Sequence, residues 1–492
     1  MERRGGRESA SGEACSVAIV PSTRGVTSPG TRGASAVPLV VASALFMDLM
    51  DSAALATALP TLSRAFHTTP FDLKFSLTAY LLTIAVCVPA SGWLSDRFGA
   101  KRLFMAAMGL FMIGSICCGL SNTVGQLVAA RVLQGLGGSM MAPVGRSIVV
   151  ASTPREALVK GMAMFTLPAI LGPLAGPPIA GLILEHGSWR WIFLMNVPVG
   201  VLGLLAVGRY VPRMPSVAVD RFDMRGFLLF ASLMLTLMTL FETASIPGLG
   251  WLRIVALLVS VVVFGCYRLH SRRIRPIVDL SLLRIDTLSL SLLAGWLQRM
   301  PLGALPFLLP LLLQVGMHIS PLGASKVMVA AVCGSLLSRF LMPPVVRRWG
   351  FRRSLMIFGL ATAVLSAAPA WFQPSTPMLA MMGIMALCGL ARSGFFIPMQ
   401  TLAYANVEPR DVAQASILFT VAQQLSFSLG VSMAAWLLKL SAGGGKLSPE
   451  TFRLPFIVMA GIAGLSVIAI WRLRRDAGEE VGGNGRSIGS SA

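Results

Sequence analysis

Long apolar segments dominate this sequence and restrict what it can fold into. About fourteen blocks alternate with short polar stretches, and each is close to the ~20 residues that a helix needs to cross a ~30 Å hydrocarbon core. The composition agrees, since 55% of the 492 residues are hydrophobic and only 12% are charged. These values exclude a soluble enzyme, a secreted disulfide scaffold and a disordered chain. We therefore predict an all-α polytopic membrane protein.

The limits of the apolar blocks give the predicted spans. An even number of spans puts both ends of the chain on one side of the membrane. The blocks lie approximately at 38–61, 74–95, 103–121, 125–150, 157–184, 189–211, 226–244, 251–269, 287–314, 322–346, 353–373, 377–402, 413–438 and 454–473.

The net charge of +21 is distributed as a topology signal. Basic residues gather in short clusters between apolar blocks, at 97–102, 272–275 and 347–353, whereas the loops around 121 and 374 are almost uncharged. Short loops rich in Lys and Arg remain in the cytoplasm. We therefore predict that these clusters and both termini are cytoplasmic. The partners expected are the lipid bilayer and a small-molecule substrate, with no nucleic acid.

Two loops of similar sequence indicate an internal repeat. The loops at 92–102 and 344–353 each place a Gly after an aromatic residue and ahead of a basic pair. Repeats of this kind are typical of alternating-access transporters. The predicted parts are a disordered cytoplasmic tail at 1–37, an amino-terminal six-span bundle at 38–211, a two-span insert with basic loops at 212–286, a carboxyl-terminal six-span bundle at 287–474 and a disordered cytoplasmic tail at 475–492.

Ionisable residues inside the predicted spans are the first functional candidates. Asp48 and Asp51 lie about one turn apart in the first span and share a helix face, and Arg131 lies early in the fourth span. A charge in hydrocarbon is costly, so it must face a cavity, pair with another charge or, for a carboxyl, take up a proton. A carboxyl that exchanges a proton as its cavity changes sides would couple proton flow to transport. A purely structural ion pair is the alternative.

The fifth span is unusually rich in Gly and Pro. Gly172, Pro173, Gly176, Pro177 and Gly181 would break a soluble helix, but in a membrane the neighbouring helices satisfy the freed carbonyl groups. The result is a bent helix with a smooth side, along which two bundles can pack closely and move. Simple packing through small residues is the alternative interpretation.

The first of the two similar loops is a second candidate for conformational switching. It contains Gly92, Asp96, Arg97 and Gly99. Asp96 can meet a helix N-terminus in the other half of the molecule, and Arg97 can bind a carboxylate there. The alternative is a topology signal followed by a tight turn.

Arginines within the apolar blocks of the carboxyl half are harder to explain by pairing. Arg299 and Arg392 lie in such blocks, and Glu242 is the comparable acid outside the first span. An excess of interior positive charge favours a pocket that accepts anionic or zwitterionic compounds. Gln134 and Arg146 of the fourth span are further candidates for substrate binding.

Five motifs occur in a fixed order: Asp51 ahead of 58–60, the loop at 92–102, and the segments 131–138, 172–181 and 189–200. Together they resemble the drug:proton antiporter branch of the major facilitator superfamily, the EmrB/QacA type with fourteen spans. The resemblance implies the major facilitator fold, in which two six-helix bundles flank a two-helix insert.

The same resemblance implies a function. It is that of a proton-coupled secondary transporter in the inner membrane of a bacterium, exporting small amphipathic compounds by alternating access. In that case Asp51 and Arg131 belong to the proton pathway, and the proton gradient is the driving force, with no cofactor.

An ATP-driven pump and a membrane enzyme are the main alternative classes. An ATP-driven pump needs a GxxxxGK[ST] loop, and the nearest match, at 443–448, has Leu after the Lys. The four His residues are scattered without metal-ligand spacing, so we predict no catalytic or metal site and no enzyme.

A channel is a further alternative, although nothing in the sequence resembles a selectivity filter or a ring of charges. Loss of transport when the pH gradient is collapsed would favour a carrier. Two alternatives stay open, an exporter of one specific anionic or zwitterionic metabolite and a membrane sensor that transports nothing. A periplasmic adaptor and an outer-membrane channel are conceivable partners that no sequence feature indicates.

Overall fold

The computed structural model describes most of the chain between the two tails. The predicted disordered tails at 1–37 and 475–492 lie outside the described residues, except for residues 36 and 37. The described residues are 36–472 except 155–156, 217–220, 244–247, 273–275, 409–410, 444 and 446. Within them the chain contains helices and connecting turns and no strand.

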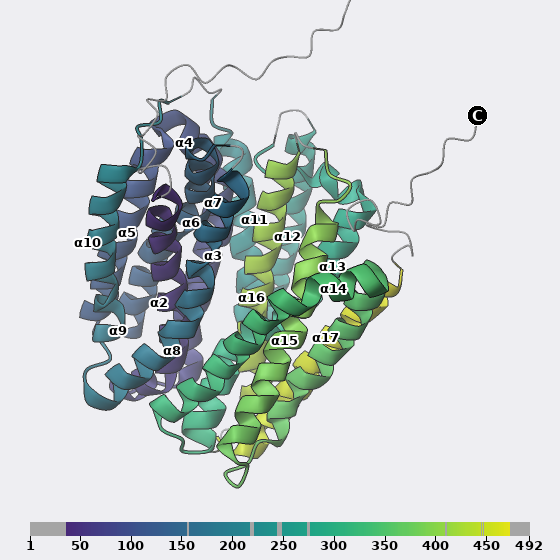
Figure 1. The fold of residues 1–492 in the computed structure, drawn as a ribbon. Helices are drawn as coiled ribbons and strands as arrows, with labels where there is room; N and C mark the ends of the chain where they lie inside the picture. The colour runs from purple at the N-terminus through teal and green to yellow at the C-terminus, as the bar shows by residue number, and fades with distance from the viewer. Residues whose placement is uncertain are drawn as a thin grey trace, which may run out of the picture.

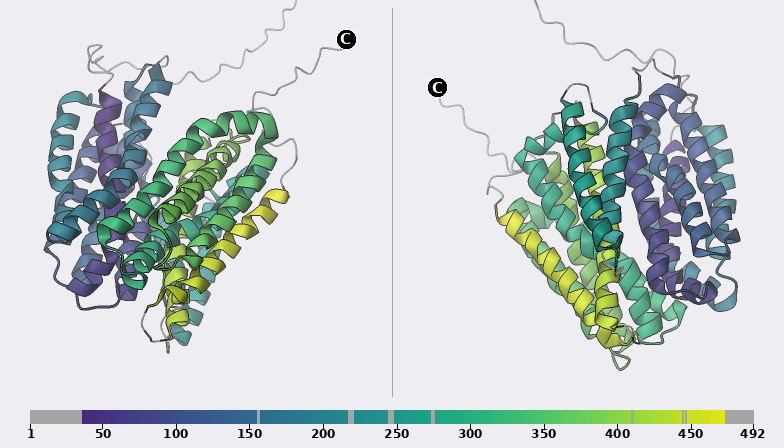
Figure 2. Two further views of the ribbon diagram at one scale, coloured as in Figure 1. Left: turned by 60° about the horizontal axis from the view of Figure 1, so that its bottom comes forward. Right: turned by 180° about the vertical axis from the view of Figure 1, so that it is seen from behind.

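The described part has 14 helices long and apolar enough to cross a membrane, which confirms the predicted number of spans. Two bundles of these helices lie side by side (Figures 1 and 2). The amino half comprises α2 (Val37–Ala65), α3 (Pro70–Cys87), η1 (Val88–Ala90), α4 (Ser91–Phe98), α5 (Ala100–Leu120), α6 (Val124–Ser152), α7 (Leu158–Thr166), α8 (Pro168–His186), α9 (Trp191–Leu194) and α10 (Asn196–Tyr210).

The insert and the carboxyl half follow in the same manner. Their elements are α11 (Met224–Glu242), α12 (Gly250–Ser271), η4 (Leu280–Arg284), α13 (Asp286–Leu311), η5 (Leu312–Gly316), α14 (Pro321–Ala367), η6 (Ala368–Trp371), α15 (Met378–Ala403), α16 (Val412–Ala442), η7 (Pro449–Phe452) and α17 (Arg453–Trp471).

Several helices begin at capping residues. The Asp72 carboxylate accepts a hydrogen bond from the Thr69 backbone N–H at 3.2 Å, and the Ser320 hydroxyl accepts one from the N–H of Gly323 at 3.1 Å. Such bonds satisfy backbone donors that have no partner within the first turn. Polar residues at these positions therefore fix where α3 and α14 start.

The two similar loops share a backbone feature. Gly99, between α4 and α5, has φ 84°, and Gly350, inside the long α14, has φ 74°. Gly350 is the non-helical position at which the tenth and eleventh spans of α14 join. A positive φ is costly for any residue with a Cβ atom, so both loops depend on Gly at the same place.

The largest part of the hydrophobic core joins the two halves at the end away from the chain termini. The largest apolar cluster combines the second part of α2, the start of α3 and the end of α8 with the end of α13 and the start of α14. At the other end, where α2 begins and α17 finishes, one cluster contains only the amino half and another only the carboxyl half. The largest apolar contact between the halves therefore lies away from the chain termini, and nearer the termini the halves meet along α3, η1 and α16.

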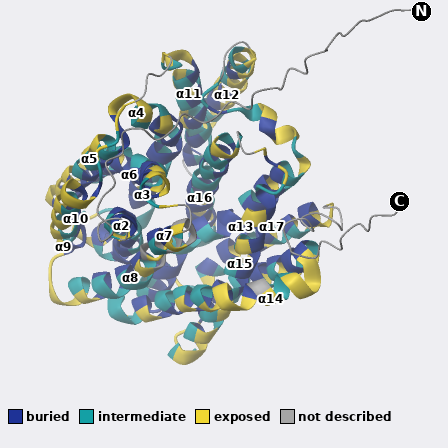
Figure 3. Cartoon of the chain, turned by 45° about the horizontal axis from the view of Figure 1, so that its top comes forward, coloured by how far each residue is buried: buried dark blue, intermediate teal, exposed yellow. Residues whose placement is uncertain are grey.

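The insert lies at the seam between the bundles. Helix α11 packs on α12 and also contacts α3 and α16, as the view from behind in Figure 2 shows. Along α12, large apolar side chains are exposed, including Trp251, Leu258 and Val262. Figure 3 shows the burial of the described residues, with buried ones in the interior and exposed ones around the rim. An apolar surface of this kind is suited to lipid contact.

Candidate functional site

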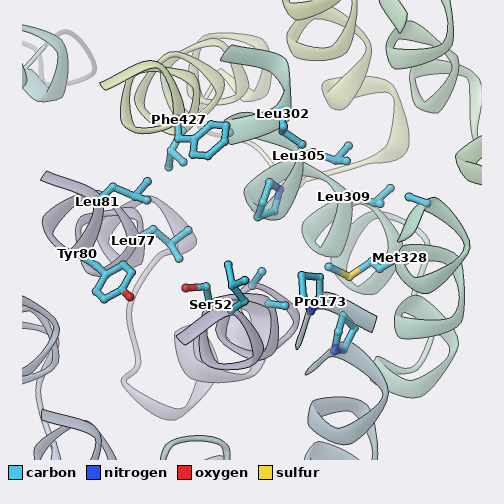
Figure 4. Close-up of a pocket in the computed structure, with 18 of the residues that line it drawn as sticks. Ser52, Leu77, Tyr80, Leu81, Pro173, Leu302, Leu305, Leu309, Met328 and Phe427 are labelled. Atoms are coloured by element: carbon cyan, nitrogen blue, oxygen red, sulfur yellow. The ribbon is translucent and has the colours of Figure 1, made fainter. Parts of the chain in front are cut away.

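A cavity of about 390 Å³ lies between the two halves, within the range of typical small-molecule sites. Its wall is mostly apolar, and α2, α3 and α8 face α13 to α16 across it (Figure 4). The lining residues labelled in Figure 4 are Ser52, Leu77, Tyr80, Leu81, Pro173, Leu302, Leu305, Leu309, Met328 and Phe427.

A buried ion pair lies beside this cavity in the amino half. Asp51 is fully buried and Arg131 is 1% exposed, and Arg131 Nη1 lies 2.5 Å from Asp51 Oδ2. The same nitrogen donates to Gln134 Oε1 at 2.6 Å, and Asn196 Nδ2 donates to Asp51 Oδ1 at 2.6 Å. The guanidinium also lies 4.1 Å from the centre of the Tyr80 ring. Asp51 and Arg131, which the resemblance places in the proton pathway, thus form an ion pair, and its partners are side chains from α3, α6 and α10.

Gln134 belongs to this network and does not line the cavity. It is fully buried, and its Nε2 donates to the Ser115 hydroxyl at 2.8 Å. Asn196 had no role in the sequence analysis beyond its place in the 189–200 motif. The available signal was an amide side chain inside an apolar span, where it needs hydrogen-bond partners.

Asp48 faces the cavity, one turn from the ion pair. It lines the cavity wall together with Tyr80 and Arg131, and its carboxylate accepts a hydrogen bond from the Tyr80 hydroxyl. The two acids of the first span thus have different surroundings, since Asp51 is enclosed by protein and Asp48 borders open space. Tyr80 was not identified from the sequence.

The fifth span contacts both halves. A Cβ atom on Gly176 would lie 2.8 Å from the carbonyl oxygen of Met50 in α2, and one on Gly181 would lie 2.9 Å from Cα of Leu322 in α14. Gly172 likewise packs closely on α2, whereas Pro173 and Pro177 line the cavity. The small residues therefore permit close approach on both sides of α8, as its composition predicted.

In the described contacts, the predicted switch loop packs against its own half and against Met214 and Phe222 of the insert. Gly92, Asp96 and Arg97 are exposed, and none of the described residues of the carboxyl half forms an ion pair with Asp96 or Arg97. Lys101 Nζ donates to the carbonyl of Val211 at 2.6 Å. The predicted contact between Asp96 and the other half is absent from this arrangement of the described residues.

The arginines of the carboxyl half have two different environments. Arg392 lines the cavity, and its Nη2 donates to the Ser335 hydroxyl at 3.2 Å. Arg299 is 6% exposed and lies between the rings of Phe396 and Phe419, 4.6 and 4.4 Å from their centres. Of these two candidates, only Arg392 borders the cavity.

Arg146, the remaining candidate for substrate binding, does not line the cavity either. It is exposed on α6. Its Nη1 reaches the Ser416 hydroxyl of α16 at 3.5 Å, which is a long contact across the two halves.

A second buried ion pair was missed in the sequence analysis. Lys74 of α3 lies 2.8 Å from Glu242 of α11, and the Ser432 hydroxyl of α16 donates to the other oxygen of Glu242 at 2.7 Å. This contact, called the insert junction below, joins the insert to both halves. The sequence indicates this pair by one Lys and one Glu inside apolar segments, because an unpaired charge there has a high free-energy cost.

One family model matches both halves of the chain. The model described as Major Facilitator Superfamily matches residues 41–295 and again 291–489. The chain belongs to the Major Facilitator Superfamily. This confirms the resemblance drawn from the five motifs, and the fold is that of two six-helix bundles with a two-helix insert.

Relatives of similar length are named for multidrug resistance. The protein MdtD of Shigella flexneri is 36% identical over 456 residues, covering 90% of this chain and 95% of the relative. MdtD of Pectobacterium carotovorum subsp. carotovorum is 36% identical over 445 residues, covering 89% and 95%.

Solved structures of transporters share the fold. The D-xylose-proton symporter matches with a TM-score of 0.64 at 14% identity, covering 89% of this chain and 97% of that one. An auto inhibited POT family peptide transporter matches with a TM-score of 0.65 at 16% identity, covering 89% and 97%. These relatives and neighbours are transporters rather than enzymes. The protein is therefore a secondary transporter of the major facilitator superfamily, a multi-pass protein of the bacterial inner membrane.

Proposed function

We propose that this transporter exports small amphipathic compounds in exchange for protons by alternating access, with both termini in the cytoplasm. The observation that supports this best is the fully buried pair of Asp51 and Arg131, because Arg131 also borders the cavity between the two halves. Relatives named for multidrug resistance give further support.

Proton coupling follows from the chemistry of this pair. An ionised Asp51 is stabilised by Arg131 and Asn196. A proton on Asp51 removes the ion pair and leaves the guanidinium, which remains charged in proteins, with Gln134 and the Ser76 carbonyl as partners. The ion pair between Asp51 and Arg131 holds α2 and α6 in one relative position. When Asp51 takes up a proton, a different relative position of the two helices becomes favourable. The Asp48 carboxyl in the cavity wall gives the proton a route from the cavity.

Alternating access follows from where the halves touch. Gln314 Nε2 donates to the Thr57 carbonyl at 2.9 Å, and the Leu322 N–H donates to Glu185 at 3.2 Å. Both contacts connect the halves at the end away from the termini. With the termini in the cytoplasm, this arrangement is the inward-facing one, and export requires these contacts to separate while the opposite end closes.

Transport by purified protein in liposomes under an imposed pH gradient tests the proposal. Proton-driven transport of an amphipathic dye should be lost in Asp51→Asn. Asp72→Asn is the matched control, because Asp72 is an exposed helix cap in the same half. Gradient-driven transport that persists in Asp51→Asn would overturn the coupling mechanism, and binding without transport under any gradient would favour a sensor.

A further inference from the structure

Three charged side chains border the cavity in the described part of the chain, Asp48, Arg131 and Arg392. Arg131 is neutralised by Asp51. Two charges are left to face a ligand, the Asp48 carboxylate on α2 in the amino half and the Arg392 guanidinium on α15 in the carboxyl half. They belong to opposite walls of the cavity.

Arg392 has donors to spare. Its hydrogen bond in the described structure goes to the Ser335 hydroxyl, and Ser335 also contacts the backbone carbonyls of Ala331 and Gly389. No described carboxylate pairs with Arg392. A guanidinium has five N–H donors in a planar fork that fits a carboxylate. A cation so placed in a membrane protein marks a binding site by default.

Arg299 of the same half also has no described carboxylate partner, but its surroundings differ from those of Arg392. The two aromatic faces beside Arg299 stabilise its charge away from the cavity, so no ligand is needed there. Arg392 has no aromatic ring over it in the described structure. Its remaining donors border open space, where a ligand can reach them.

We propose that the cavity binds amphipathic zwitterions, with the carboxylate of the ligand on Arg392 and its cationic group towards Asp48. This inference rests on the proposed proton exchange. The cationic group of a zwitterion competes with a proton at Asp48, as exchange requires. A simple cation is repelled by Arg392, and a simple anion binds better when Asp48 holds a proton, which leads to cotransport instead.

The rest of the wall defines the body of the ligand. Figure 4 shows Phe427, Leu302 and Leu305 on one side of the cavity and Leu77 and Leu81 on another. Such apolar side chains favour an aromatic or aliphatic frame between the two charged ends. The charges select the ligand by its end groups, and the apolar wall accepts frames of different shape.

Three xanthene dyes with one frame test this arrangement. Rhodamine 110 is a zwitterion, its methyl ester rhodamine 123 is a cation, and fluorescein is an anion. Binding is measured by fluorescence polarisation with purified protein in lipid nanodiscs, at one pH and without a gradient. We expect rhodamine 110 to bind at least about tenfold more tightly than either of the others.

Single substitutions test which residue binds each charged end of the dye. Arg392→Gln should remove the preference for rhodamine 110 over its ester, and Arg392→Lys should keep part of it. Asp48→Asn should remove the preference over fluorescein. Arg339→Gln is the matched control, because Arg339 is an exposed cation one turn from Ser335 on α14 and does not line the cavity. It should keep both preferences.

Several results would overturn the inference. These are equal binding of the ester or of fluorescein, an unchanged preference in a folded Arg392→Gln protein, and no binding of any of the dyes. Failure of the proposed function is recognised separately, since dye binding to the parent protein is measured without a gradient, whereas the proposed function is tested by gradient-driven export in liposomes. If the dye preference holds and export is independent of protons, only the exchange mechanism fails.

Discussion

The two halves of the molecule hold their interior arginines in different ways. In the amino half, Arg131 is surrounded by a carboxylate, an amide, a backbone carbonyl and an aromatic ring. In the carboxyl half, Arg299 has only aromatic faces and Arg392 only a hydroxyl among the described contacts. The amino half thus contains a complete charge pair, which a proton opens in the proposed mechanism. The carboxyl half contains an unpaired charge among the described contacts, which a ligand completes in the proposed binding mode.

The largest expected effect comes from breaking the complete pair. Asp51→Asn leaves Arg131 buried without a counter-charge and should lower the free energy of unfolding by about 3–5 kcal/mol. The double variant Asp51→Asn with Arg131→Gln should recover most of that stability without restoring proton-driven transport. Thermal unfolding and liposome transport of the three proteins measure the two effects. If the double variant were less stable than Asp51→Asn, the pair would not be the stabilising unit.

The equivalent loops give the next comparison. A Cβ atom on Gly99 would meet the carbonyl oxygen of Met214 at 2.8 Å, whereas nothing lies within 4 Å of one on Gly350. Both substitutions to Ala carry the strain of a positive φ, and only Gly99→Ala adds a clash. We expect losses of stability of about 3 kcal/mol for Gly99→Ala and about 1 kcal/mol for Gly350→Ala. If both variants lost the same stability in thermal unfolding, the close contact of residue 99 with the Met214 carbonyl would have no effect on stability.

The insert junction tests whether a pair across the seam behaves like the pair inside one half. Lys74→Met and Glu242→Gln should each cost about 2 kcal/mol, less than Asp51→Asn because the Glu242 side chain is 11% exposed. Combining the two substitutions should restore part of the loss. Additive losses in a double-mutant cycle would mean that the two side chains act independently.

The smallest effect is expected at Arg299, with the opposite sign. Arg299→Met removes a buried charge that no described carboxylate balances and should keep or raise stability, by at most about 1 kcal/mol. Arg299→Lys keeps the charge, loses the planar stacking between two rings and should be less stable than the parent protein. A marked loss of stability in Arg299→Met would mean that the charge of Arg299 stabilises the folded protein, which contradicts this prediction.

Much of the fold could be predicted because a bilayer imposes length and polarity on every span. The structure confirms fourteen spans, and the pairing of Asp51 with Arg131 follows from the cost of charge in hydrocarbon together with the family resemblance. Tyr80 and Asn196 could not be identified, since the rotation of each helix about its axis decides which face meets Asp48 or Asp51. For the same reason the sequence did not separate Arg392, which borders the cavity, from Arg299.

The insert junction has a consequence for how the surrounding membrane acts on the protein. Glu242 is bound to α3 of one half and α16 of the other, while α12 presents its apolar side chains outwards. If α3 and α16 move apart in the proposed alternating-access cycle, the insert must follow at least one of them and displace neighbouring lipids laterally. Bilayer thickness and lateral pressure would then contribute to the work of that proposed cycle.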